Sequence, residues 1–98
     1  PRLKTDLGEV MMRTAQGRLR GLDLEWDKSA CVGVVLASGG YPDTYNTGYL
    51  VEGLGELDEG ISVFHAGTRE VSREDFVSDE VVTDGGRVLT LSPVIIFE

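Results

Sequence analysis

The fold depends first on one stretch of sequence, residues 29–37, which reads SACVGVVLA. Its inner part, CVGVVL at 31–36, is a continuous apolar run rich in valine. Such a run is typical of a β-strand that is covered on both faces. We therefore expect residues 30–36 to form the central strand of a sheet that neighbouring segments complete.

A loop motif follows this strand at once, SGGYP at residues 38–42. Its two glycines allow positive φ angles or a close approach of the backbone to a ligand. Pro42 then stiffens the exit from the loop. Taken alone, the motif is more typical of a tight turn than of a binding site, so both interpretations stay open.

Further strands are expected on the carboxyl side of this loop. They comprise a short strand at 49–51, a loop with one helical turn at 53–60, a strand at 61–66, an exposed polar excursion at 71–79, and a last strand at 94–97 set off by Pro93. Between them, VVTDGGRVL at 81–89 has the form of a β-hairpin with a glycine-containing turn.

The amino-terminal segment predicts a single helix over residues 6–16. Asp6 can cap it, with Glu9 as the other half of a capping box, and Gly17 is a suitable stop. One apolar face follows from the helical spacing of Leu7, Val10, Met11 and Ala15. A helix followed by several strands predicts an α+β protein with an antiparallel or mixed sheet, with the helix on or beside it.

The composition is that of one small globular domain with a modest core. The chain has 98 residues, of which 41% are hydrophobic. Its 17 acidic and 9 basic residues argue against a nucleic-acid binder, because no large basic surface can contact phosphates. One small cationic pocket for a single phosphate remains compatible with this charge.

The sequence also argues against a disulfide, a zinc site and a membrane-spanning segment. One cysteine, Cys31, and one histidine provide neither an internal disulfide nor a zinc site, and they fit a reduced cytoplasmic protein with Cys31 in the core. No apolar run approaches the ~20 residues of a membrane span, and no signal peptide is recognisable. Because the first residue is Pro1 and not Met, we interpret the sequence as a fragment or a processed product.

No catalytic constellation is visible. His65 has no Ser or Cys partner suggested by a motif, and a structural histidine at a strand end is the preferred interpretation. The glycine pairs do not match the phosphate-loop or dinucleotide patterns. Trp26, in a polar connector at 18–28, is interpreted as a local packing residue.

Four motifs together resemble a known family. They are PRLKTDL at 1–7, VLASGGYP at 35–42, VFHAGT at 63–68 and VTDGGRVL at 82–89. In order and spacing they resemble the phosphoribosylamine–glycine ligases, whose ATP-grasp portion closes on a Pro-Arg-Leu-Lys-Ser-Asp-Leu pattern. The resemblance ends near Leu89, and TLSPVIIFE at 90–98 does not follow the family pattern.

The resemblance implies an activity and a division of the chain. The family joins phosphoribosylamine to glycine with ATP and Mg²⁺ through a glycyl phosphate. The resemblance assigns residues 1–19 to the end of the ATP-grasp domain and residues 20–98 to a truncated C-terminal sheet domain. The ATP-binding lobes and metal ligands are expected upstream of Pro1. The isolated chain is therefore expected to be inactive, without bound ATP or metal, and to self-associate through the β-prone run at 94–97.

The resemblance also implies a ribose-phosphate site. Arg87 is the leading ligand, because a guanidinium matches phosphate oxygens in a bidentate way; the alternative is an exposed hairpin arginine. The other candidates are Gly67 and Thr68 as a second contact, Ser38, Gly39, Gly40, Tyr41 and Pro42 as pocket lining, and Lys4. A competing hypothesis is a non-catalytic binding or scaffolding sheet domain, the remnant of such a ligase.

Overall fold

The computed structural model describes residues 1–72 and 80–95, which belong to two compact units. Unit 1 contains Pro1–Val32 and the end of the chain from Val94, and unit 2 contains Gly33–Pro93. The elements are α1 (Leu7–Ala15), β1 (Ala30–Cys31), β2 (Val34–Ala37), the 3₁₀ turn η1 (Leu54–Glu56), β3 (Ile61–His65), β4 (Thr68–Val71), β5 (Glu80–Thr83) and β6 (Arg87–Ile95). One helix and antiparallel strands confirm the predicted α+β class.

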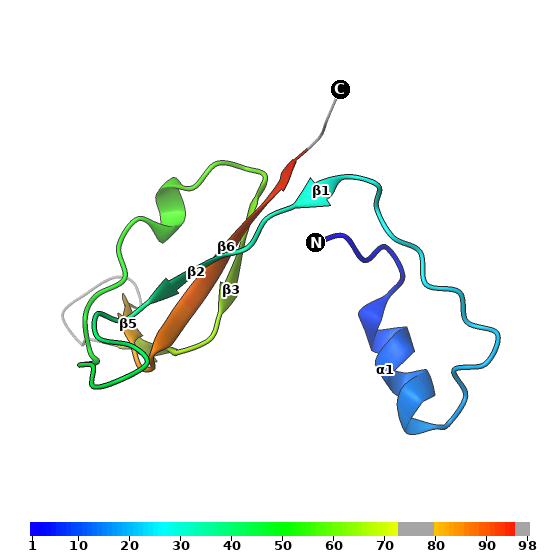
Figure 1. The fold of residues 1–98 in the computed structure, drawn as a ribbon, viewed down its shortest axis with the longest axis horizontal. Coiled ribbons are helices and arrows are strands. Elements are labelled where there is room, and N and C mark those ends of the chain that lie inside the picture. The colour runs from blue at the N-terminus through cyan, green and yellow to red at the C-terminus, as the bar shows by residue number, and fades with distance from the viewer. Residues whose placement is uncertain (73–79, 96–98) are drawn as a thin grey trace. The chain divides into compact units, whose positions relative to one another are not determined.

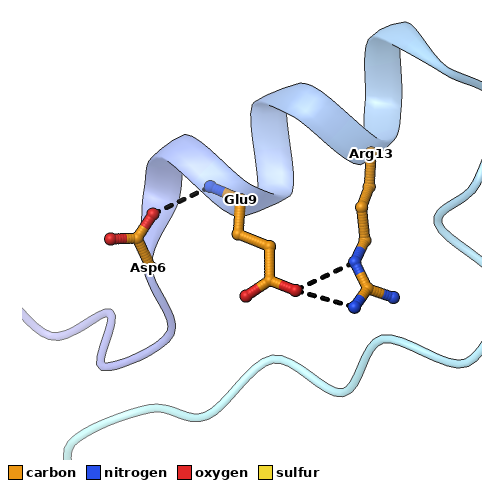
Figure 2. A network of polar contacts seen from close by, with 3 residues as sticks. All are labelled: Asp6, Glu9 and Arg13. Atoms are coloured by element: carbon orange, nitrogen blue, oxygen red, sulfur yellow. Dashed lines mark hydrogen bonds and ion pairs between the residues drawn. The ribbon is translucent and has the colours of Figure 1, made fainter.

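Helix α1 begins at an aspartate cap, as predicted. The N–H of Glu9 donates to Oδ1 of Asp6 at 2.8 Å (Figure 2), which satisfies one of the amides that a helix start leaves open. The Glu9 carboxylate, however, accepts hydrogen bonds from Nε and Nη2 of Arg13 at 3.0 and 2.7 Å. This i,i+4 ion pair takes the place of the reciprocal half of the predicted capping box.

Helix α1 ends at Ala15, and Gly17 provides the stop, as predicted. Gly17 has a φ of +66°. The N–H of Arg18 donates to the carbonyl of Arg13 at 2.8 Å, and that of Gly17 to the carbonyl of Thr14 at 3.1 Å. These two bonds close the last turn in a Schellman arrangement, which requires a left-handed residue at this position.

Backbone pairing organises the rest of unit 1. Leu3 forms an antiparallel bridge with Trp26, which is 55% exposed.

The pKa of Asp27 lies below its ordinary value because the side chain and backbone of Ser29 hydrogen-bond the carboxylate, with smaller contributions from the charges of Lys4 and Arg2. Strand β1 pairs antiparallel with the end of β6, where Cys31 faces Val94 and is only half-buried.

Strand β6 lies at the centre of the sheet in unit 2 (Figure 1). It pairs antiparallel with β2 on one side, from Val34↔Leu91 onward, and with β3 on the other, from Ile61↔Pro93 to His65↔Leu89. The prediction that residues 30–36 form the central strand is therefore wrong. Their apolar run predicts a strand but not its neighbours, and it is divided between β1 and β2.

The predicted hairpin across 81–89 is also wrong. Strand β5 pairs with β4, from Thr68↔Thr83 to Val71↔Glu80, while β6 pairs with β3. Residues 84–86 therefore link two strand pairs that follow one another along an antiparallel ribbon. Glycines in a strand-like sequence are compatible with a turn or with a bulge, and here they form a bulge.

The remaining predictions have mixed outcomes. The strand at 61–66 and the helical turn within 53–60 are confirmed as β3 and η1. The strand at 49–51 is reduced to one bridge, Leu50↔Val82. Strand β6 continues through Pro93 to Ile95, so no separate last strand begins after Pro93; the remainder of 94–97, like residues 73–79 of the predicted excursion, lies outside the described residues.

The core is as modest as the chain length predicts. Among the described residues, the buried side chains are Val82, Val88, Leu89 and Ser92. Three of these four belong to β6 and the fourth to β5. The most tightly packed part of the protein therefore lies immediately beside the bulge at 84–86.

Replacing the helix cap should destabilise α1. We expect Asp6→Ala to lower helix stability by about 0.5–2 kcal/mol, because the amide of Glu9 loses its acceptor. Far-UV circular dichroism during urea titration measures this change. Asp23→Ala is the matched control, since Asp23 is an exposed aspartate outside the helix. Equal effects of the two substitutions would contradict the capping role.

Candidate functional site

The candidate site is built on a bulge in the ribbon of β3–β4 and β5–β6. His65 pairs with Leu89 and Thr68 with Thr83, so two residues on one strand face five on the other. The N–H of Gly67 donates to the carbonyl of Arg87 at 2.8 Å, and the N–H of Asp84 donates to the carbonyl of Gly67 at 2.7 Å. The surplus residues therefore form a bulge directly before Arg87.

The two strands of the ribbon come very close at this point. A Cβ on Gly67 would stand 2.7 Å from the Cα of Gly85 and 2.7 Å from the carbonyl oxygen of Arg87. A real Cβ essentially never makes such contacts with backbone atoms. Glycine at position 67 is required by this crossing, which explains the residue without any ligand.

Loop residues 38–42 attach to the bulge through Ser38. Its N–H donates to the carbonyl of Gly86 at 2.7 Å, and its Oγ donates to the carbonyl of Gly85 at 2.9 Å. The N–H of Tyr41 donates in turn to the carbonyl of Ser38 at 3.0 Å. Two segments far apart in sequence are therefore joined by hydrogen bonds at the start of β6.

Arg87 opens onto a hollow of about 470 Å³ next to the bulge. The hollow is lined by Val35, Tyr41, Ala66, Gly67, Gly86, Arg87, Leu89 and Thr90. Arg87 is exposed, and within residues 1–72 and 80–95 its guanidinium has no ion-pair or hydrogen-bond partner. An unneutralised guanidinium beside a concave surface can bind an anion through two parallel N–H donors.

The predicted site residues do not all reach this hollow. Gly67, Tyr41 and Arg87 line it together. Ser38 and Gly39 line a neighbouring hollow of about 410 Å³, with apolar residues such as Leu36, Tyr49 and Leu50. Gly40 has a φ of +96° and serves the turn of the loop.

Pro42 and Lys4 have other surroundings. Pro42 follows Tyr41 through a cis peptide bond in the same loop. Lys4 belongs to unit 1, where its N–H donates to the carbonyl of Glu25 at 2.9 Å. The structure gives neither residue a ligand-binding role, and both roles stay predictions.

Gly67 and Thr68 offer fewer free donors than the sequence predicts. The N–H of Gly67 is already donated to Arg87. Oγ1 of Thr68 lies 2.9 Å from Nδ1 of His65, and both residues line a third hollow with Glu70 and Val81. His65 therefore has a hydrogen-bond partner at the end of its strand, in keeping with the structural interpretation. The role of Gly67 and Thr68 as a second phosphate contact stays a prediction.

Several lining residues of the Arg87 hollow were missed by sequence reasoning. Gly86 was assigned to a turn, and Val35, Ala66 and Thr90 were not singled out. Strand register places Thr90 here, because Val35 of β2 and Phe64 of β3 both pair with it. The sequence carries no signal for this register. In the described part of the chain, no group of three His, Cys, Asp or Glu side chains could hold a metal ion.

The fold and the site define a small α+β domain that presents an arginine beside a glycine bulge. A family model described as "Phosphoribosylglycinamide synthetase, C domain" matches residues 31–94. The chain belongs to this family. The match includes Val94 and so passes Leu89, the residue near which the motif resemblance ends.

The chain is also similar to curated proteins named phosphoribosylamine–glycine ligase. It is 47% identical over 92 residues to that of Halalkalibacterium halodurans and 44% identical over 93 residues to that of Escherichia coli K12. These matches cover 94% and 93% of this chain but only 20% of each relative. The chain thus spans about a fifth of the length of the curated relatives it matches. Among the helices that the structure describes, none could cross a membrane.

The close crossing at Gly67 yields a stability prediction. Gly67→Ala should destabilise unit 2 by about 1–3 kcal/mol, because the new methyl group meets backbone atoms on the opposite strand. Urea unfolding measures this loss. Gly60→Ala is the matched control, since a Cβ there meets nothing within 4 Å and φ is not positive. A Gly67→Ala protein as stable as the control would show that the ribbon does not cross this closely.

Proposed function

We propose that this chain is the C-terminal part of a phosphoribosylamine–glycine ligase, a cytoplasmic enzyme of purine synthesis that joins phosphoribosylamine and glycine with ATP. The family match and the relatives' shared name support the proposal. ATP and Mg²⁺ would be bound by other parts of the enzyme. Because phosphoryl transfer needs a nucleotide and metal held in position, the 98-residue chain alone should not form product.

Within this enzyme, the chain would contribute to the ribose-phosphate site. The observation that carries this role is the exposed guanidinium of Arg87, which borders a hollow and has no partner in the described residues. The chain as a whole has a net charge of −8. A phosphate would therefore be attracted by a local cation and not by the overall field of this chain. Gly67 and Gly86 line the same hollow beside that cation.

Arg87→Ala in the full-length enzyme tests this role. Loss of one charge-assisted contact should cost about 1.5–3 kcal/mol, which is roughly a ten- to hundredfold increase in the KM for phosphoribosylamine. The KM values for ATP and glycine should change little. Steady-state kinetics with each substrate varied in turn provide the measurement.

Arg20→Ala is the control for a general loss of positive charge, because Arg20 is exposed and lies in unit 1. If Arg87→Ala leaves the KM for phosphoribosylamine unchanged and lowers only stability, Arg87 is a structural residue. A non-catalytic scaffolding domain would then be the better interpretation of the fragment.

Self-association of the isolated chain through its C-terminal strand is a second proposal. Val94 and Ile95 are 39% and 36% exposed, and exposed apolar strand residues favour pairing with another chain. We expect a mass above that of the monomer by light scattering after size-exclusion chromatography, and Ile95→Lys should reduce it. Leu24→Lys is the control, because Leu24 is exposed but outside any strand. A monomer at every concentration would refute this proposal.

A further inference from the structure

The bulge before Arg87 needs an external support. Residues 84–86 exceed the length of the facing strand, so their carbonyl groups cannot all join the β3–β6 or β4–β5 ladders. Backbone carbonyls without a partner make such a segment adaptable in conformation. Arg87 follows these residues directly, and its own carbonyl accepts from the N–H of Gly67. The carbonyl groups of the bulge are therefore the next part of the backbone that has to be held for Arg87 to keep one direction.

Ser38 provides that support. It donates its N–H to Gly86 and its Oγ–H to Gly85, so one residue binds two consecutive carbonyl groups of the bulge. Ser38 is half-buried and does not line the Arg87 hollow. Since a hydroxyl has one proton to donate, the proton given to Gly85 is not available for a ligand.

The ring of Tyr41 covers the backbone of Gly86, whose carbonyl accepts from Ser38. Gly86 is buried, and a Cβ there would come within 2.7 Å of Cε2 of Tyr41 and 3.1 Å of Cε1 of Tyr45. The two tyrosine rings are tilted by 56°, with their centroids 6.3 Å apart. The aromatic rings therefore lie directly over the glycine backbone, and Tyr41 also borders the Arg87 hollow.

The geometry points to Ser38 as a positioning residue for Arg87: it fixes the bulge through two carbonyl groups and does not bind the substrate itself. This inference rests on the proposed phosphate-binding role of Arg87. It gives the loop at 38–42 a task that differs from the pocket lining expected from sequence. Gly86 is needed for the same arrangement of Ser38, Tyr41 and the bulge, because only glycine leaves space for the ring of Tyr41.

A double-mutant cycle in the full-length enzyme tests the inference. Ser38→Ala should raise the KM for phosphoribosylamine about three- to tenfold, as expected for one displaced charged contact, with the KM values for ATP and glycine unchanged. Ser38→Thr retains the hydroxyl and should restore most of the affinity. In an Arg87→Ala background, Ser38→Ala should have no further effect, because Ser38 acts through Arg87. Fully additive effects would overturn the inference.

Hydrogen exchange measured by mass spectrometry separates this inference from the proposed function. Ser38→Ala should speed the exchange of amides at 84–88, Ser38→Thr should not, and Gly86→Ala should do so by displacing Tyr41. Unchanged exchange in Ser38→Ala would refute the support of the bulge, whatever the kinetics. If exchange changes as expected but Arg87→Ala leaves the KM for phosphoribosylamine unchanged, Arg87 does not bind phosphate. Ser38 would then support the bulge without positioning a substrate ligand.

Discussion

The pairing of β6 on both sides is the constraint on which the sheet of unit 2 depends. Within residues 1–72 and 80–95, strands β2 and β3 are joined only through β6, by ladders that share Leu89, Thr90 and Leu91. A central strand has its backbone groups paired at both edges, and its side chains have neighbours on both flanking strands. Val88, Leu89 and Ser92 of β6 are buried. A substitution that disturbs β6 should therefore affect both neighbours at once, whereas one in β2 or β3 acts on a single ladder.

The bulge adds a second feature to this structural strand, an exposed arginine beside a hollow. The surplus residues lie between β5 and β6, where Gly67 and Gly85 cross, and they place the exposed Arg87 at the first position of β6. The ribbon itself stays paired on both sides of the bulge, so a rigid support and an exposed cation lie next to each other. Rigid support matters for phosphate recognition, because a guanidinium held in one direction loses less conformational entropy on binding than a freely moving one.

The most apolar strand is not the best buried one. Val34, Val35 and Leu36 in β2 are 54%, 52% and 43% exposed, although their sequence is the strongest strand signal in the chain. Burial of apolar surface stabilises by about 25 cal/mol per Å² removed from water, and β2 obtains little of this within the described residues. The core at β5 and β6 must therefore supply most of the stability of unit 2, which is why a clash at Gly67 is expected to be costly.

The sequence by itself determined what depends on local chemistry. The helix cap at Asp6, the stop at Gly17, strand β3 and the α+β class follow from side-chain hydrogen bonding, the conformational freedom of glycine and apolar periodicity. The family was also recognisable from short motifs in order. Only the tertiary structure decided that β6 is central, that residues 84–86 form a bulge, and that Ser38 binds the bulge while Tyr41 and Arg87 share a hollow. These features depend on which distant segments pair, and periodicity specifies the face of a strand but not its partner.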